Sequence, residues 1–214
     1  MNVDIKGPII NSNDQWIYDW FGIEATSPKM VHEAIKEANG EQLDIYINSG
    51  GGDVFAGSEI YSAIREYPGE VRIHVVGIAA SAASVIMCAG WADASPTATI
   101  MVHNVSSWAD GDYHDMDKAS EMLQQANRSI AAAYVAKTGR PESEMLKMMD
   151  KETWLTAEDA LEKGLIDSIA QTQNKTTMVA SVEKLIPPEI IKKMQQERAD
   201  LQKDLEALEQ KGWK

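Results

Sequence analysis

Along residues 1–104, short runs rich in β-branched residues alternate with helical patterns, and few folds accommodate that alternation. The run "LDIYIN" shows the strand signal most clearly, because apolar and polar residues alternate in it with a period of two. Short connections between the runs predict an α/β domain with a largely parallel sheet and a functional site at the carboxyl ends of its strands. The expected strands are residues 2–10, 43–48, 71–77 and 98–104, and the expected helices between them are residues 27–40, 54–69 and 81–90.

Beyond residue 104 the pattern becomes helical. Thr156 and Asp159 form a near capping box at the start of the last helix of this part, and Gly164 is a C-cap. Near the C-terminus, apolar residues at 3-4 spacing fit equally a short coiled coil and an amphipathic helix lying on the domain. The expected helices are residues 110–139, 140–150, 156–167 and 187–210. The expected organisation is a domain over residues 1–170, a linker over 171–185 and a C-terminal helical extension over 186–214.

The charge balance excludes some classes of partner. Lysine and arginine number 20 against 33 acidic residues, which gives a formal net charge of −13. Nucleic acid and anionic membranes both need a positive face, so neither is expected as a partner. The N-terminus "MNVDIKGPII" lacks a signal-peptide pattern, and the longest apolar stretch is too interrupted to cross a bilayer. The single cysteine, Cys88, fits a small buried residue in a reducing compartment, so we expect a cytoplasmic protein.

Two features could form a catalytic centre. In "INSGGGDV", three consecutive glycines follow a strand, and they fit either a tight turn or backbone N–H groups that stabilise an oxyanion. In "VVGIAASAASVIMCAG", Ser81 opens a helix of small residues, where it fits either an N-cap or a nucleophile. If Ser81 is a nucleophile, the N–H of Ala82 and that of Gly51 or Gly52 are the candidate oxyanion donors. Ser84, one turn further on, is expected to face the packed interior.

A serine nucleophile needs a base, and the base needs an acid that orients it. His103 ends the strand "ATIMVH" at a carboxyl end, which is where a base is expected. The other three histidines have weaker claims: His32 and His114 have polar helical neighbours, and His74 lies within a strand. The candidate acids, Asp150 and Glu152, stand just before the helix that begins near Thr156, a position that acids also favour for the helix dipole alone.

Four motifs together resemble the proteolytic subunit of the Clp protease, a serine peptidase family with the crotonase-like fold. They are "INSGGGDVFAGSEIY", "GIAASAASVIMCAG", "IMVHN" and "ETWLTAEDALEKGLIDSI", in the family's order. The resemblance implies repeated strand-strand-helix units and a protruding handle helix. It also implies Ser81 as nucleophile, His103 as base and Glu152 at the acid position, where the family has Asp; Asp150 is the alternative acid.

The "ETW" motif and the C-terminal helical pattern look more like the Clp-like head-maturation proteases of tailed phages and prophages. That resemblance implies ATP-independent processing of capsid and scaffold proteins, protein substrates and a homo-oligomeric ring, either a heptamer or a double ring. No counterpart of the segment that engages an unfoldase ATPase is expected, and no cofactor or metal. Two alternatives stay open: a crotonase-type acyl-CoA enzyme, and a proteolytically inactive ring-forming assembly factor.

Overall fold

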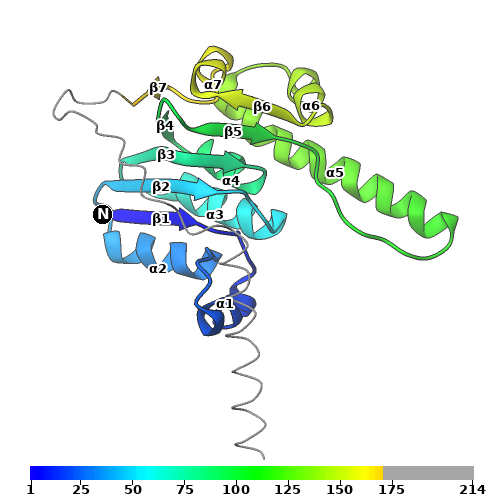
Figure 1. Cartoon of the computed structure of the whole chain (residues 1–214), viewed down its shortest axis with the longest axis horizontal. Helices are drawn as coiled ribbons and strands as arrows, with labels where there is room; N and C mark the ends of the chain where they lie inside the picture. The colour runs from blue at the N-terminus through cyan, green and yellow to red at the C-terminus, as the bar shows by residue number, and fades with distance from the viewer. Residues whose placement is uncertain (171–214) are drawn as a thin grey trace, which may run out of the picture. The chain divides into compact units, whose positions relative to one another are not determined.

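The computed structural model describes residues 1–170, which form a mixed sheet flanked by helices (Figure 1). The predicted linker over 171–185 and helical extension over 186–214 lie outside these residues. The strands are β1 (Asn2–Lys6), β2 (Leu43–Ser49), β3 (Val71–Ala80), β4 (Trp91–Ala94), β5 (Thr99–Val102), β6 (Thr153–Thr156) and β7 (Ser168–Ile169). The α-helices are α1 (Gln15–Phe21), α2 (Pro28–Ala38), α3 (Val54–Glu66), α4 (Ala82–Met87), α5 (Tyr113–Thr138), α6 (Glu142–Asp150) and α7 (Ala157–Lys163), and one 3-10 turn, η1, covers Ser12–Asp14.

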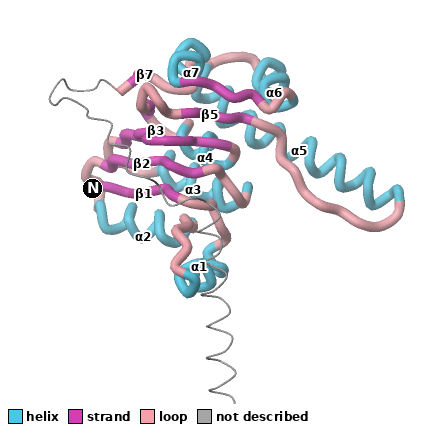
Figure 2. The backbone as a smooth tube through the Cα atoms, viewed as in Figure 1, coloured by secondary structure: helices cyan, strands magenta, loops and turns pink. Residues whose placement is uncertain are grey.

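The predicted α/β class with a parallel sheet is confirmed. The strand order is β1-β2-β3-β4-β7, all in parallel, and only the β5–β6 pair is antiparallel. Figure 2 shows the strands lying one beside the next in the sheet, with helices packed beside them. In β2 every second side chain is buried, as the period-two pattern predicts, while the side chains between them are partly exposed.

Strand β3 changes partners midway, and this change places the candidate site. Its first part pairs with β4 and its last part, Ile78–Ala80, pairs with β5. Between the two parts the register against β2 shifts, and the Asn48 side chain accepts a hydrogen bond from the N–H of Ile78 at 3.2 Å. Such a bulge bends a strand and redirects it. The carboxyl ends of β3 and β5 therefore lie side by side.

Several predicted boundaries were wrong. The first strand ends at Lys6, four residues before the predicted end at residue 10, and a turn with positive φ at Gly7 follows. The third strand runs three residues further than predicted, to Ala80. The prediction also missed helix α1 and the strands β4, β6 and β7. All the helices that were expected within residues 1–170 are present, and their ends lie within a few residues of the predicted ones.

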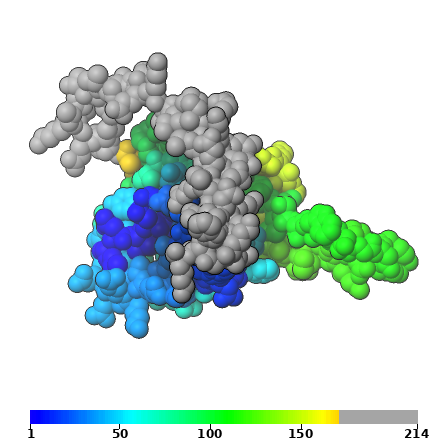
Figure 3. Space-filling model, turned by 60° about the horizontal axis from the view of Figure 1, so that its bottom comes forward, coloured from blue at the N-terminus to red at the C-terminus, as the bar shows by residue number. Residues whose placement is uncertain are grey.

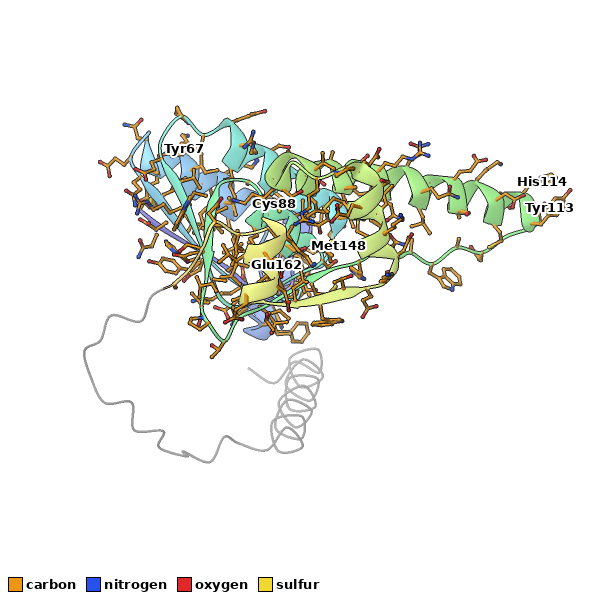
Figure 4. The ribbon with its side chains drawn as sticks, turned by 90° about the horizontal axis from the view of Figure 1, so that it is seen from above. Tyr67, Cys88, Tyr113, His114, Met148 and Glu162 are labelled. Carbon is orange, nitrogen blue, oxygen red and sulfur yellow. The ribbon has the colours of Figure 1, made fainter. Side chains whose placement is uncertain are left out.

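Helix α5 is the longest element of residues 1–170, and its first half has no buried residue. Its 26 residues make it about 39 Å long. Its buried residues, Ile130, Ala131, Ala133 and Tyr134, all lie in its second half. The first half stands clear of the sheet and its helices (Figure 3), with Tyr113 and His114 near the tip (Figure 4). The predicted protruding helix is confirmed. No helix within residues 1–170 is long and apolar enough to cross a membrane.

Candidate active site

Ser81 occupies the sharp turn between β3 and α4 and has an unusual backbone conformation. Its φ of 55° and ψ of −126° lie where L-residues other than glycine are rare. The turn is fixed on both sides: the N–H of Ser81 donates to the carbonyl of Met101 at 3.0 Å, and its carbonyl accepts from the N–H of Ser84 at 2.9 Å. A strained backbone of this kind persists only where the surroundings over-determine it, and it is concentrated at functional sites.

His103 lies against Ser81. It follows β5 by one residue, and its Nε2 is 2.8 Å from the Oγ of Ser81. The parallel pairing of β3 with β5 explains this closeness, because it brings both carboxyl ends to one place. An imidazole at this distance can accept the hydroxyl proton as the serine attacks.

The glycine turn packs directly against the serine turn. A Cβ added to Gly51 would lie 2.6 Å from the carbonyl oxygen of Ala80 and 2.7 Å from the Cβ of Ser81. The glycines are therefore required for this close approach, whatever their chemical role. The N–H of Gly51 donates to the Oγ of Ser49 at 3.1 Å, so in this structure it is already engaged.

Two other residues of the glycine and serine turns line the cavity and carry candidate donor N–H groups. Within residues 1–170, no hydrogen bond engages the N–H of Gly52 or of Ala82. Both residues line a cavity of about 220 Å³ that also exposes Ser81 and His103. They are the better-placed candidates for oxyanion donors, and Gly51 is the weaker one.

The cavity continues along α5 into an apolar hollow of about 250 Å³. The two share the residues Gly52, Val54, Val105 and Ser106. The hollow adds the side chains of Phe55, Met122 and Leu123.

The two candidate acids are engaged elsewhere. The Nδ2 of Asn104 donates to Asp150 Oδ1 at 2.8 Å, and the Nε1 of Trp154 donates to Glu152 Oε1 at 3.3 Å. No hydrogen bond within residues 1–170 joins His103 to either carboxylate. Glu152 has a φ of 47°, so the backbone of this candidate acid is itself in a rare conformation. The identity of the acid therefore stays a prediction.

The remaining histidines and the cysteine lie away from the serine. His32 contacts Glu59 at 3.2 Å, and His74 contacts Asp93 at 2.9 Å on the partly exposed face of the sheet. Cys88 is buried, as predicted, and burial raises the pKa of its thiol to about 12 (Figure 4). A thiol of this kind is no nucleophile at neutral pH.

Three polar residues near the site were not foreseen in a functional role. Ser84 was expected to be buried, which is confirmed, but its hydroxyl bonds to the carbonyl of Ser81 and to the hydroxyl of Tyr134. Asn127 accepts from the N–H of Val105, two residues after His103. The sequence carries no local signal for the contacts of Ser84 with Tyr134 and of Asn127 with Val105, because each joins segments more than twenty residues apart.

Comparison with known proteins places these motifs in a family. The Clp protease family profile matches residues 27–173. The proteolytic subunit of the ATP-dependent Clp protease of Porphyromonas gingivalis is 32% identical over 139 residues, which are 64% of this chain and 63% of that protein. Subunit 2 of Thermobifida fusca is 34% identical over 130 residues, 59% of this chain and 64% of that protein. The chain thus spans less than two thirds of these relatives.

Proposed function

Since this chain belongs to the Clp protease family, we propose that it is a serine endopeptidase with Ser81 as nucleophile and His103 as base. The observation that carries the proposal is the 2.8 Å contact between His103 Nε2 and Ser81 Oγ, at a strained turn beside a cavity. Family membership alone would not separate an active enzyme from a relative that had lost its chemistry.

The geometry supports a specific sequence of steps. His103 accepts the proton of the Ser81 hydroxyl as its Oγ attacks the peptide carbonyl, and a tetrahedral intermediate forms. The N–H groups of Gly52 and Ala82 stabilise the oxyanion. His103 then donates the proton to the leaving amine, and water hydrolyses the acyl-enzyme by the same route. Glu152, or Asp150 in its place, orients the imidazole once substrate has ordered the site, since catalytic hydrogen bonds are often long before substrate binds.

Reaction with a fluorophosphonate probe tests the nucleophile. The wild-type protein should be labelled at Ser81, and Ser81→Ala should lose both labelling and peptide cleavage while keeping its fold. Ser62→Ala is the matched control, because Ser62 is exposed on α3 and its hydroxyl donates to the carbonyl of Ser58 in the same helix. Labelling of Ser84 in place of Ser81 would contradict the assignment.

The same probe separates the alternatives. A crotonase-type acyl-CoA enzyme shares the backbone oxyanion site but has no serine nucleophile, so it would not be labelled at Ser81. A proteolytically inactive ring-forming factor would assemble and also stay unlabelled.

Assembly into a homo-oligomeric ring is the second part of the proposal. The first half of α5 supports it, since among residues 1–170 its apolar side chains Met116 and Met122 stay exposed. Light scattering should give about seven times the monomer mass of 23.6 kDa, or twice that for a double ring. A monomer that cleaves peptide at full rate would contradict this part.

The finer part of the proposal concerns the substrates: phage capsid and scaffold proteins, processed without ATP. It is supported by the resemblance of the "ETW" motif and the C-terminal helical sequence pattern to head-maturation proteases. The named relatives, by contrast, are subunits of ATP-dependent proteases. The purified protein should cleave an unfolded substrate such as casein with no nucleotide present. A strict requirement for an added ATPase would contradict this part and leave the peptidase assignment standing.

A further inference from the structure

A buried pair of hydroxyls connects helix α5 to the serine turn. Ser84 has no exposed surface and Tyr134 is 1% exposed, and their oxygens are 2.8 Å apart. The direction of this hydrogen bond follows from its neighbour. Ser84 has one hydroxyl proton and donates it to the carbonyl of Ser81 at 2.7 Å, so Tyr134 must donate to Ser84. The result is a relay of two hydrogen bonds from α5 to the backbone of Ser81.

This relay acts on Ser81, whose backbone conformation is rare for a residue other than glycine. The carbonyl of Ser81 accepts three hydrogen bonds: from the N–H of Ser84 at 2.9 Å, from the N–H of Val85 at 3.3 Å, and from the Ser84 hydroxyl at 2.7 Å. The hydroxyl contact is the shortest of the three. It is also the only one that reaches beyond α4, because Tyr134 continues it to another element.

The same face of α5 also holds the histidine segment. Asn127 and Tyr134 are seven residues apart, two helical turns, and so they point the same way. The Oδ1 of Asn127 accepts from the N–H of Val105 at 2.8 Å, two residues after His103. Ile130, between them on the helix, lines the cavity that holds Ser81 and His103.

We propose that this face of α5 positions both halves of the catalytic pair, with Tyr134 and Ser84 holding the Ser81 turn and Asn127 holding the chain after His103. The inference rests on the proposed function, because it assigns these residues a role in aligning that nucleophile with that base. They are positioning residues and do not touch the reacting atoms. One rigid helix sets both anchors, so the spacing between serine and histidine depends on it.

Removing single hydroxyls tests the relay. Tyr134→Phe and Ser84→Ala should each lower the second-order rate constant of fluorophosphonate labelling and the kcat of peptide cleavage about 10-fold, because a misalignment well under 1 Å is costly in a preorganised site. KM should stay within about twofold, because the hydroxyls removed are buried against each other and the Tyr134 ring that lines the cavity is kept in Tyr134→Phe. The double variant should be no slower than the slower single variant, since both changes break one relay.

Matched controls lie on the same helix. Tyr113→Phe removes a phenol hydroxyl from the exposed tip of α5, and Ser129→Ala removes an exposed hydroxyl that bonds within the helix. Both should react at the wild-type rate. Asn127→Ala should slow labelling as Tyr134→Phe does. Asn127→Asp, which keeps the acceptor oxygen, should restore most of the rate.

The outcomes separate the two claims. If wild-type protein is labelled at Ser81 but Tyr134→Phe and Asn127→Ala match it within twofold, the positioning role is refuted and the peptidase assignment stands. If the wild type is not labelled at all, both fall. Should Ser84→Ala fail to fold, Tyr134→Phe still decides, because it removes one oxygen and leaves the Ser84 hydroxyl its acceptor on Ser81.

Discussion

Gly52→Ala should damage both the stability and the chemistry of this protein. Gly52 has a φ of 152°, and an added Cβ would lie 2.1 Å from the carbonyl oxygen of Ile9, where real contacts of a Cβ do not fall below 3.0 Å. The two segments must therefore separate by about 0.9 Å. They are joined by two backbone hydrogen bonds, from the N–H of Ile9 to the carbonyl of Gly51 at 2.9 Å and from the N–H of Asp53 to the carbonyl of Ile9 at 2.8 Å.

The expected magnitude follows from these contacts. Losing two backbone hydrogen bonds costs about 1 kcal/mol each, and a non-glycine residue at this φ costs about 1–3 kcal/mol. We therefore expect Gly52→Ala to lower the free energy of unfolding by about 3–5 kcal/mol. The same shift should displace the N–H of Gly52, the proposed oxyanion donor, and loss of one such donor lowers kcat about 10²–10³-fold.

Urea unfolding and fluorophosphonate labelling together check this prediction. Gly50→Ala is the stability control: no atom lies within 4 Å of an added Cβ there, and Gly50 is not among the glycines with positive φ. Its unfolding midpoint should match that of the wild type. If Gly52→Ala unfolds at the wild-type urea concentration, the packing argument is refuted. If it is destabilised yet labels and cleaves at the wild-type rate, the oxyanion role of Gly52 is refuted.

Glu152→Gln should lower kcat by about 10²-fold or more, and by more than Asp150→Asn does, because the acceptor on His103 fixes the tautomer of the imidazole and stabilises the imidazolium. Steady-state kinetics that show the reverse order would assign the role to Asp150. The free energy of unfolding should fall as the pH rises from 9 to 12, since burial raises the pKa of the Cys88 thiol to about 12 and also that of the Tyr134 phenol, so the unfolded chain releases protons first. Cys88→Ala should flatten that fall in a pH series of urea titrations, and an unchanged slope would contradict it. In the native protein at pH 8, Cys88 should resist alkylation by iodoacetamide, which mass spectrometry can follow, and should react once the chain is unfolded.

The parts of the fold that sequence could predict are those in which periodicity reflects burial. Strand β2 alternates because every second side chain is buried, and it was placed within one residue of its true end. Helix α1 was not predicted, because none of its residues is buried and its sequence therefore carries no periodic pattern of burial. Four of its seven residues are nevertheless large and apolar. Strand β4, "WADA", has only four residues and no β-branched side chain.

The candidate site divides in the same way. Ser81 and His103 could be paired from sequence, because both follow strands and parallel strands present their carboxyl ends together. The acid could not, because Asp150 ends helix α6 and Glu152 lies in the turn before β6, where loop geometry decides which carboxylate reaches the imidazole. Tyr134 and Asn127 could not either, since the faces they share with the site exist only once α5 has packed.

The small residues around Ser81 are needed both for close packing and for the proposed chemistry. A Cβ on Gly57 would lie 2.9 Å from the Cβ of Ala82, and one on Gly51 would lie 2.7 Å from the Cβ of Ser81. Helix α3, the glycine turn and α4 therefore approach as closely as backbones can. A larger side chain at Ala82 would push α4 away from α3 and carry the Ala82 N–H with it. Every residue of α4 is buried, so no exposed position exists at which the helix could absorb the shift. Close packing therefore fixes the position of the Ala82 N–H relative to Ser81. The small residues that resemble ordinary core residues also hold the proposed oxyanion site in place.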